Sequence, residues 1–159
     1  MVKFARYIFC ISFLIISVIC SGCASTYLCK YIKDKNPYKR DFYISFDKCK
    51  DVLSKALKAQ GWIVLEEVDP NVYEHRQEVE EGAKQVLLLT DQKRLSLTPI
   101  SWARLNIYLS GKDAGSTTSA EIRFVKATRL TFKTLYGYRY DAAVESIYKE
   151  MEAILQNAE

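Results

Sequence analysis

Hydrophobic and polar residues alternate most cleanly in two segments, residues 102–110 and 116–128, which the pattern predicts to be strands. In WARLNIYLS (102–110) the apolar side consists of Ala103, Leu105, Ile107 and Leu109, and the other side of Trp102, Arg104, Asn106 and Tyr108. One face should therefore be buried and the other polar. The second segment repeats this, with Ala120, Ile122 and Phe124 opposite Glu121 and Arg123. GKDAGS between them predicts a turn, so the two strands should form a hairpin.

Two other segments show helical spacing. In KCKDVLSKALKAQ (48–60) the apolar residues recur at helical intervals, Asp47 stands where an N-cap belongs, and Gly61 ends the pattern. YDAAVESIYKEMEAILQ (140–156) predicts a second amphipathic helix. Its apolar stripe consists of Val144, Ile147, Met151 and Ile154.

Shorter apolar runs predict the remaining strands, which are FYISF (42–46), WIVLEEV (62–68) and KQVLLLTD (84–91). RLSLTP (94–99) follows as a further stretch. Residues 72–83 fit a loop, a short helix or a hairpin extension, and residues 128–138 fit a continued strand or a loop. The order β-α-β-β-β-β-α predicts a two-layer α+β fold, an antiparallel meander sheet with two helices on one face.

The first residues follow a different pattern. MVKFARY carries Lys3 and Arg6, and an apolar run of 13 residues from Ile8 to Cys20 follows. As a helix this run would span only about 20 Å of the ~30 Å hydrocarbon core of a bilayer. A basic start, a short apolar centre and a small-residue end are typical of an export signal.

The end of this segment, Cys20-Ser21-Gly22-Cys23, resembles the lipobox of bacterial lipoproteins. That resemblance implies cleavage between Gly22 and Cys23 and attachment of lipid to Cys23, although Cys20 replaces the usual Leu. Several acyl chains would then hold the protein on a membrane, because one chain alone binds only marginally. By analogy with enterobacterial sorting, Ala24 after the Cys implies the outer membrane, facing the periplasm.

Residues 24–41 are polar and basic, contain Pro37 and lack a sustained period, which predicts a flexible tether. Fully extended, it would reach about 60 Å. The chain therefore divides into a signal peptide (1–22), an anchor and tether (23–41) and one α+β domain (42–157).

Cys29 and Cys49 are the cysteines that remain after export and lipidation. In an oxidising periplasm they could pair, or Cys49 could stay a free thiol packed in the first helix. Without a CxxC motif, and with His75 as the only histidine, the sequence predicts no metal site and no cofactor.

Charge and motifs exclude several classes of protein. Lys3 and Arg6 are the only charged side chains before Cys23, so 21 basic and 19 acidic side chains remain after it, a net charge of +2. Nucleic-acid binders usually carry a larger basic excess. GxSxG, P-loop and HExxH motifs are absent, which argues against an enzyme. Two enzymatic alternatives remain. One is a Cys-His enzyme that uses Cys49 and His75, and the other is a glycosidase that uses one of two acidic groups, Glu66, Glu67 and Asp69 or Glu78, Glu80 and Glu81.

Residues 126–140 combine basic and aromatic side chains, the types favoured at interfaces. The candidate interaction surface consists of Arg129, Lys133, Tyr136, Tyr138 and Arg139. The alternative is a strand end whose aromatic residues cover the edge of the core.

The first predicted helix running into Gly61-Trp62, followed by a meander and a terminal helix, resembles the helix-grip domains in the lipoprotein subunit of the outer-membrane barrel assembly machinery. We therefore expect a non-catalytic interaction or assembly module on the cell envelope, with an envelope protein as partner. The alternative is a lipoprotein that holds a small apolar or glycan ligand between sheet and helix.

Overall fold

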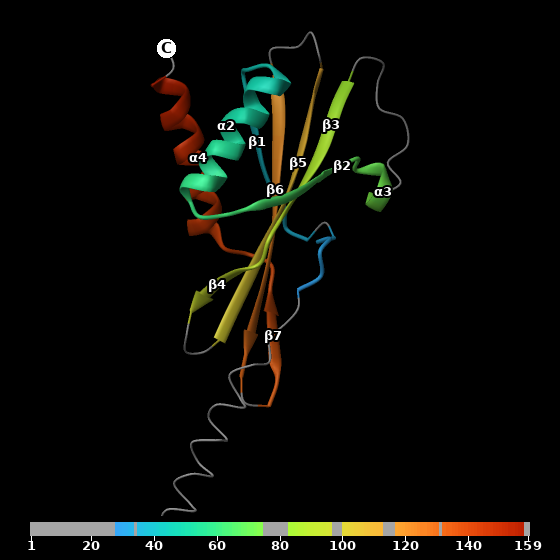
Figure 1. The fold of residues 1–159 in the computed structure, drawn as a ribbon, viewed down its shortest axis with the longest axis vertical. Coiled ribbons are helices and arrows are strands. Elements are labelled where there is room, and N and C mark those ends of the chain that lie inside the picture. The colour runs from blue at the N-terminus through green and yellow to red at the C-terminus, as the bar shows by residue number, and fades with distance from the viewer. Residues whose placement is uncertain are drawn as a thin grey trace, which may run out of the picture.

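The computed structural model describes residues 28–33, 35–74, 83–96, 100–112, 117–130 and 132–157. In these it contains an open antiparallel sheet with its two long helices on one face, which confirms the predicted α+β class (Figure 1). The strands are β1 (Tyr38–Phe42), β2 (Val64–Val68), β3 (Ala83–Thr90), β4 (Lys93–Ser96), β5 (Ile100–Lys112), β6 (Thr118–Arg129) and β7 (Thr134–Gly137). The helices are α2 (Phe46–Ala59), α3 (Asn71–Glu74) and α4 (Asp141–Gln156).

The predicted hairpin of β5 and β6 forms the central pair of strands in the sheet. These strands pair from Ile100 with Arg129 to Gly111 with Thr118. The outer edge of β5 pairs with β3 at one end and β4 at the other, so β3 and β4 form one strand interrupted at residues 91–92. The outer edge of β6 likewise pairs with β1 at one end and β7 at the other. β2 pairs with β3 and ends the sheet.

Helices α2 and α4 lie side by side over one face of the sheet, here called the helix face (Figure 1). The predicted apolar sides of β5, β6 and both helices meet there and form the main core, as expected. Figure 1 also shows that β4 and β7 extend the sheet well beyond the end of the helices. Among the described residues, no helix is long and apolar enough to cross a membrane.

The residues at both ends of α2 show where the helix starts and stops. Ser45, rather than Asp47, is the N-cap residue, and Asp47 lies in the first turn. At the other end Gly61 has a φ of 71°, and the Trp62 N–H donates to the Leu57 carbonyl over 2.8 Å. This is a Schellman cap, which requires a left-handed residue that glycine adopts without strain. The predicted end of the helix at Gly61 is confirmed.

The predicted strand over 42–46 is wrong. The strand is β1, Tyr38–Phe42, and the chain already turns into α2 at Phe46. Phe42 and Phe46 are both buried, whereas Tyr43 between them is 85% exposed. The apolar run therefore marks a corner at which two aromatic residues enter the core from successive elements.

The other face of the sheet, here called the second face, also differs from expectation. Its side chains Arg104, Asn106, Glu121 and Arg123 are buried rather than solvated. Residues 28–33 cover them, with Leu28 and Ile32 packed against Val125 and Ala127 of β6. The prediction of a flexible tether up to residue 41 is therefore wrong for these residues, because two apolar side chains four positions apart attach them to the sheet. The described residues that belong to the fold therefore start at Leu28 rather than at Phe42.

The structure assigns part of the two segments, residues 72–83 and 128–138, for which the sequence allowed more than one type of element. Residues 71–74 form α3, while residues 75–82, including His75, lie outside the described residues. In the second segment β7 folds back on β6, and a turn joins the two strands. The predicted signal peptide and Cys23 also lie outside the described residues.

Cys29 and Cys49 are both free thiols. Cys49 is buried in the helix-face core, and Cys29 is exposed in the segment that covers the second face. The sheet lies between them, so the alternative in which they pair does not fit this fold.

Candidate functional site

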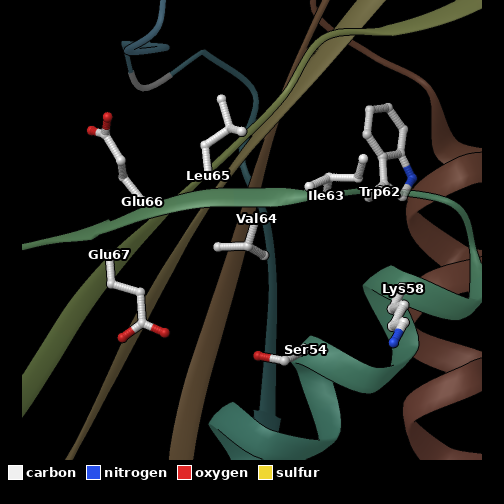
Figure 2. Close-up of a pocket in the computed structure, with 8 residues that line it drawn as sticks. All are labelled: Ser54, Lys58, Trp62, Ile63, Val64, Leu65, Glu66 and Glu67. Atoms are coloured by element: carbon white, nitrogen blue, oxygen red, sulfur yellow. The ribbon is translucent and has the colours of Figure 1, made fainter.

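A groove of about 460 Å³ lies between the edge strand β2 and helix α2 (Figure 2). Ser54 and Lys58 of α2 line one side, and residues 62–67 line the other. Figure 2 shows the side chains of Val64 and Glu67 pointing toward α2, and those of Leu65 and Glu66 pointing away from it. We call this site the β2–α2 groove.

A β-bulge shapes this groove. Val64 pairs with Thr90 and Glu66 pairs with Leu89, so Leu65 is an additional residue in β2. An extra residue breaks the alternation of side chains, which places Leu65 and Glu66 on the same side of the strand. Leu65 is 51% exposed, and Ile63, immediately before β2, is 63% exposed. The groove therefore lies beside two apolar side chains that face solvent at and just before the edge strand.

The acidic pair Glu66 and Glu67 does not form a two-carboxylate site. Their side chains point to opposite sides of β2 (Figure 2). Glu67 forms an ion pair with Lys50 of α2, and Glu66 forms one with Lys30 in the segment that covers the second face. Glycoside hydrolysis needs two carboxylates that face the same bond. Here the two carboxylates instead fix β2 to the elements on either side of it.

A second pocket, of about 290 Å³, lies on the second face between the segment that contains residues 28–33 and Lys35 and the end of the sheet. The ammonium group of Lys35 lies 4.5 Å from the centre of the Tyr138 ring, a distance suited to a cation–π contact. The pocket is lined by Leu28, Cys29, Tyr31, Ile32, Lys33, Lys35, Val125, Tyr136 and Tyr138. We call it the basic-aromatic pocket.

The structure divides the predicted interaction surface into three parts. Tyr136 and Tyr138 line the basic-aromatic pocket. Arg129 and Lys133 stand at the turn between β6 and β7, and both are exposed. Arg139 lies apart from them at the start of α4, where its Nε is 3.7 Å from Asp141. The five residues therefore do not form one continuous site.

A buried ionic cluster on the second face was missed by the sequence patterns. Arg123 is fully buried, and its Nε donates to Glu121 over 2.6 Å. Its Nη1 contacts Glu74 of α3. Tyr31 donates its hydroxyl proton to the same Glu74 over 2.9 Å, and its ring stacks on Tyr73. The cluster thus joins the N-terminal segment, α3 and β6 across the second face.

The electrostatics of this cluster favour a structural role. Burial by itself lowers the pKa of Arg123, but hydrogen bonds and charge from Glu74 and Glu121 more than reverse this and raise it. Burial and the hydrogen bond to Glu74 raise the pKa of Tyr31. The guanidinium and the phenol therefore keep their protons at neutral pH and serve as hydrogen-bond donors.

Backbone groups of the N-terminal segment are also fixed by side chains of the sheet. The Ile32 N–H donates to Asn106 Oδ1 over 2.5 Å, and Asn106 Nδ2 donates to the Lys30 carbonyl over 3.1 Å. Arg104 Nη1 donates to the Leu28 carbonyl over 3.1 Å. The signal available in the sequence was the pair Leu28 and Ile32, whose spacing could have identified a cover for this face.

Cys49 does not have the properties of a catalytic thiol. Burial raises its pKa to about 11, so it stays protonated and unreactive at neutral pH. Within the described ranges, no three or more His, Cys, Asp or Glu side chains are grouped to hold a metal ion. Neither a protein-family model, nor a curated protein, nor a solved structure matches this chain.

Proposed function

We propose that this protein is a lipid-anchored protein of the cell envelope whose domain binds another envelope protein without catalysis. Lipid on Cys23 would hold it to the outer membrane, facing the periplasm, after cleavage at Gly22–Cys23. The observation that supports a binding role is the β2–α2 groove. There two exposed apolar side chains, Leu65 of β2 and Ile63 just before it, border an open space of about 460 Å³.

The shape of the β2–α2 groove suits an extended segment of a partner. β2 ends the sheet among the described residues, so its outer edge can pair with an added strand. Such pairing gives affinity through main-chain hydrogen bonds, and alternate side chains of the added strand give specificity. Ile63 and Leu65 offer apolar contact, and Lys58 adds a positive charge on the helix side of the groove. An extended apolar segment with an acidic residue opposite Lys58 fits this arrangement.

The second candidate function is the binding of a small apolar or glycan molecule in the same place, between sheet and helix. The volume of the β2–α2 groove is in the range of small-molecule sites, about 300–1,000 Å³. Native mass spectrometry of the protein released from membranes distinguishes the two functions. A bound small molecule would favour the second, and a stoichiometric protein partner would favour the first.

The decisive variant is Ile63→Asp combined with Leu65→Asp, because both side chains are exposed and their loss should not affect folding. We expect a partner that co-purifies with the wild-type protein from solubilised membranes to be lost. Val72→Asp is the matched control, since Val72 is 65% exposed and lies on α3, outside the groove. Retention of the partner by the groove variant, or its loss from the control, would count against the groove.

The anchor is tested separately. Replacing Cys23 with Ala should abolish acyl labelling and release the protein from the membrane fraction. Unchanged membrane partition, with acyl label still present, would contradict lipidation at Cys23 and would leave the groove experiment unaffected.

A further inference from the structure

The most exposed large apolar side chain of the described residues lies at the turn between β6 and β7. Phe132 is 98% exposed and Leu130 is 41% exposed. The turn is closed by the Leu130 N–H, which donates to the Lys133 carbonyl over 2.8 Å. We call Leu130, Phe132 and Lys133 the hairpin tip. Figure 1 shows that this end of the sheet projects away from α2 and α4.

The exposure of Phe132 is unlike that of a residue that covers a core edge. A phenyl ring in water forgoes roughly 1.5–3 kcal/mol that it would gain in an apolar environment. Leu135 of β7, which is 44% exposed, adds to the apolar surface near the tip. Contiguous exposed apolar side chains usually mark a contact with another molecule or with a membrane.

The charge around the hairpin tip has one sign. Residues 125–140 contain no Asp or Glu. Their basic residues are Lys126, Arg129, Lys133 and Arg139. Arg129 and Lys133 stand at the turn itself, whereas Arg139 lies at the start of α4 beside Asp141. An apolar tip flanked by Arg129 and Lys133 complements an anionic lipid surface, which attracts Lys and Arg and accepts apolar side chains below its headgroups.

The position at which the chain enters the fold points to the same surface. Leu28 packs beside Ala127, which precedes Leu130 by three residues, or about 10 Å along a strand. Leu28 follows Cys23 by five positions, so this stretch can reach at most about 18 Å. A lipid on Cys23 would therefore hold the end of the sheet that carries the hairpin tip close to the bilayer.

We propose that the hairpin tip inserts Phe132 into the headgroup region of an anionic membrane, as a second contact beside the lipid anchor. This inference rests on the proposed lipidation of Cys23. Two separate contacts would set the orientation of the domain on the membrane, which a single flexible anchor cannot do. The β2–α2 groove, which lies away from β7, would then face the periplasm (Figure 1).

The test uses the full lipidated chain reconstituted in vesicles of phosphatidylcholine and phosphatidylglycerol whose acyl chains carry bromine. The wild-type chain contains Trp62 and Trp102, so its quenching is measured first and subtracted from that of each variant. In one variant Phe132→Trp then adds a fluorophore at the hairpin tip. In the control Tyr43→Trp places it at the opposite end of β6, at a site that is 85% exposed. Because inserted side chains reach about 5–10 Å into the headgroup and acyl boundary, we expect at least about threefold stronger quenching of Trp at 132 than at 43.

Equal quenching of the two variants would overturn the proposal. A further variant, Lys133→Glu, should weaken the quenching of Trp at 132 in anionic vesicles. An unchanged signal would contradict a role of the basic residues in membrane binding. Acyl labelling of Cys23 in the same sample separates the two proposals. Labelled protein without quenching contradicts the hairpin contact alone, and unlabelled protein contradicts the anchor.

Discussion

The two faces of the sheet are both buried, but by different means. On the helix face, side chains such as Leu105 and Phe124 lie in an apolar core that they share with α2 and α4. On the second face, their sequence neighbours Asn106 and Arg123 are equally buried, yet they form hydrogen bonds and ion pairs. Each strand of the β5–β6 hairpin therefore presents an apolar interior to one side and a polar interior to the other.

The difference follows from what covers each face. Long amphipathic helices bury a continuous apolar stripe, and hydrophobic burial is non-directional. The second face is covered by residues 28–33, which form no helix or strand and whose backbone groups need partners from elsewhere. Asn106 and Arg104 supply these partners, and directional bonds hold an irregular segment in one position. Polar side chains of the second face therefore supply the backbone hydrogen bonds that a helix or strand in residues 28–33 would have formed.

Replacement of Arg123 should have the largest effect on stability. In Arg123→Met the carboxylates of Glu74 and Glu121 lose their buried partner, and we expect a loss of about 3–5 kcal/mol in the free energy of unfolding, measured in urea. The variant that also carries Glu74→Gln and Glu121→Gln should be more stable than Arg123→Met alone. If it is not, the cluster does not act through its charges.

Leu105 and Asn106, neighbours with no exposed surface, should respond in different ways. Leu105→Ala should lose about 2–5 kcal/mol and raise hydrogen exchange throughout the domain, because it creates a cavity in the shared core. Asn106→Ala should lose about 1–3 kcal/mol, because it leaves the Ile32 N–H and the Lys30 carbonyl without their partner. Its faster exchange should be confined to residues 28–33. A global response in both variants would mean that the two faces unfold as one unit.

Lys39→Ala gives a smaller effect within the same cluster. Lys39 Nζ lies 3.3 Å from Glu121, but the lysine side chain is 62% exposed, so water screens the pair. We expect a loss of at most about 1 kcal/mol in thermal or urea unfolding. A loss as large as that of Arg123→Met would show that burial of the basic residue does not explain why the two ion pairs differ in their contribution to stability.

The two cysteines provide a comparison that should leave stability unchanged. A maleimide should modify the exposed Cys29 at pH 7–8, whereas Cys49, whose pKa burial raises to about 11, should react only after unfolding. Mass spectrometry of the native protein should therefore find one modified thiol among these two. Rapid modification of Cys49 would indicate that α2 opens locally.

The helix face could be predicted from the sequence because its signals are periodic. Alternation identified the apolar sides of β5 and β6, helical spacing identified α2 and α4, and Gly61 marked the end of α2. The corner at Phe42 and Phe46 was harder to predict from the sequence. An aromatic run is compatible with one strand, and equally with two residues that enter the core from different elements. β7 is only four residues long and too short to show a period.

The burial of the second face was harder to predict, because its cover has no sustained period and offers only the spacing of Leu28 and Ile32 as a signal. Alternation placed Glu121 and Arg123 on a polar side, and polar sides are usually solvated. Their burial depends on Glu74 and Tyr31, which lie far away in the sequence and contact them only in the fold. The β2–α2 groove was equally hidden, since the bulge at Leu65 arises from pairing with β3 rather than from a local sequence signal.

The attachment of residues 28–33 also has a mechanical consequence. Tension from a lipid on Cys23 would enter the domain at Leu28 and peel this segment from the sheet one hydrogen bond at a time, before β1 is loaded. The chain from Leu28 to Pro37 would then extend to at most about 32 Å while the helix face stays folded. If the proposed anchor and partner exist, such a segment would absorb movement between them without unfolding of the domain.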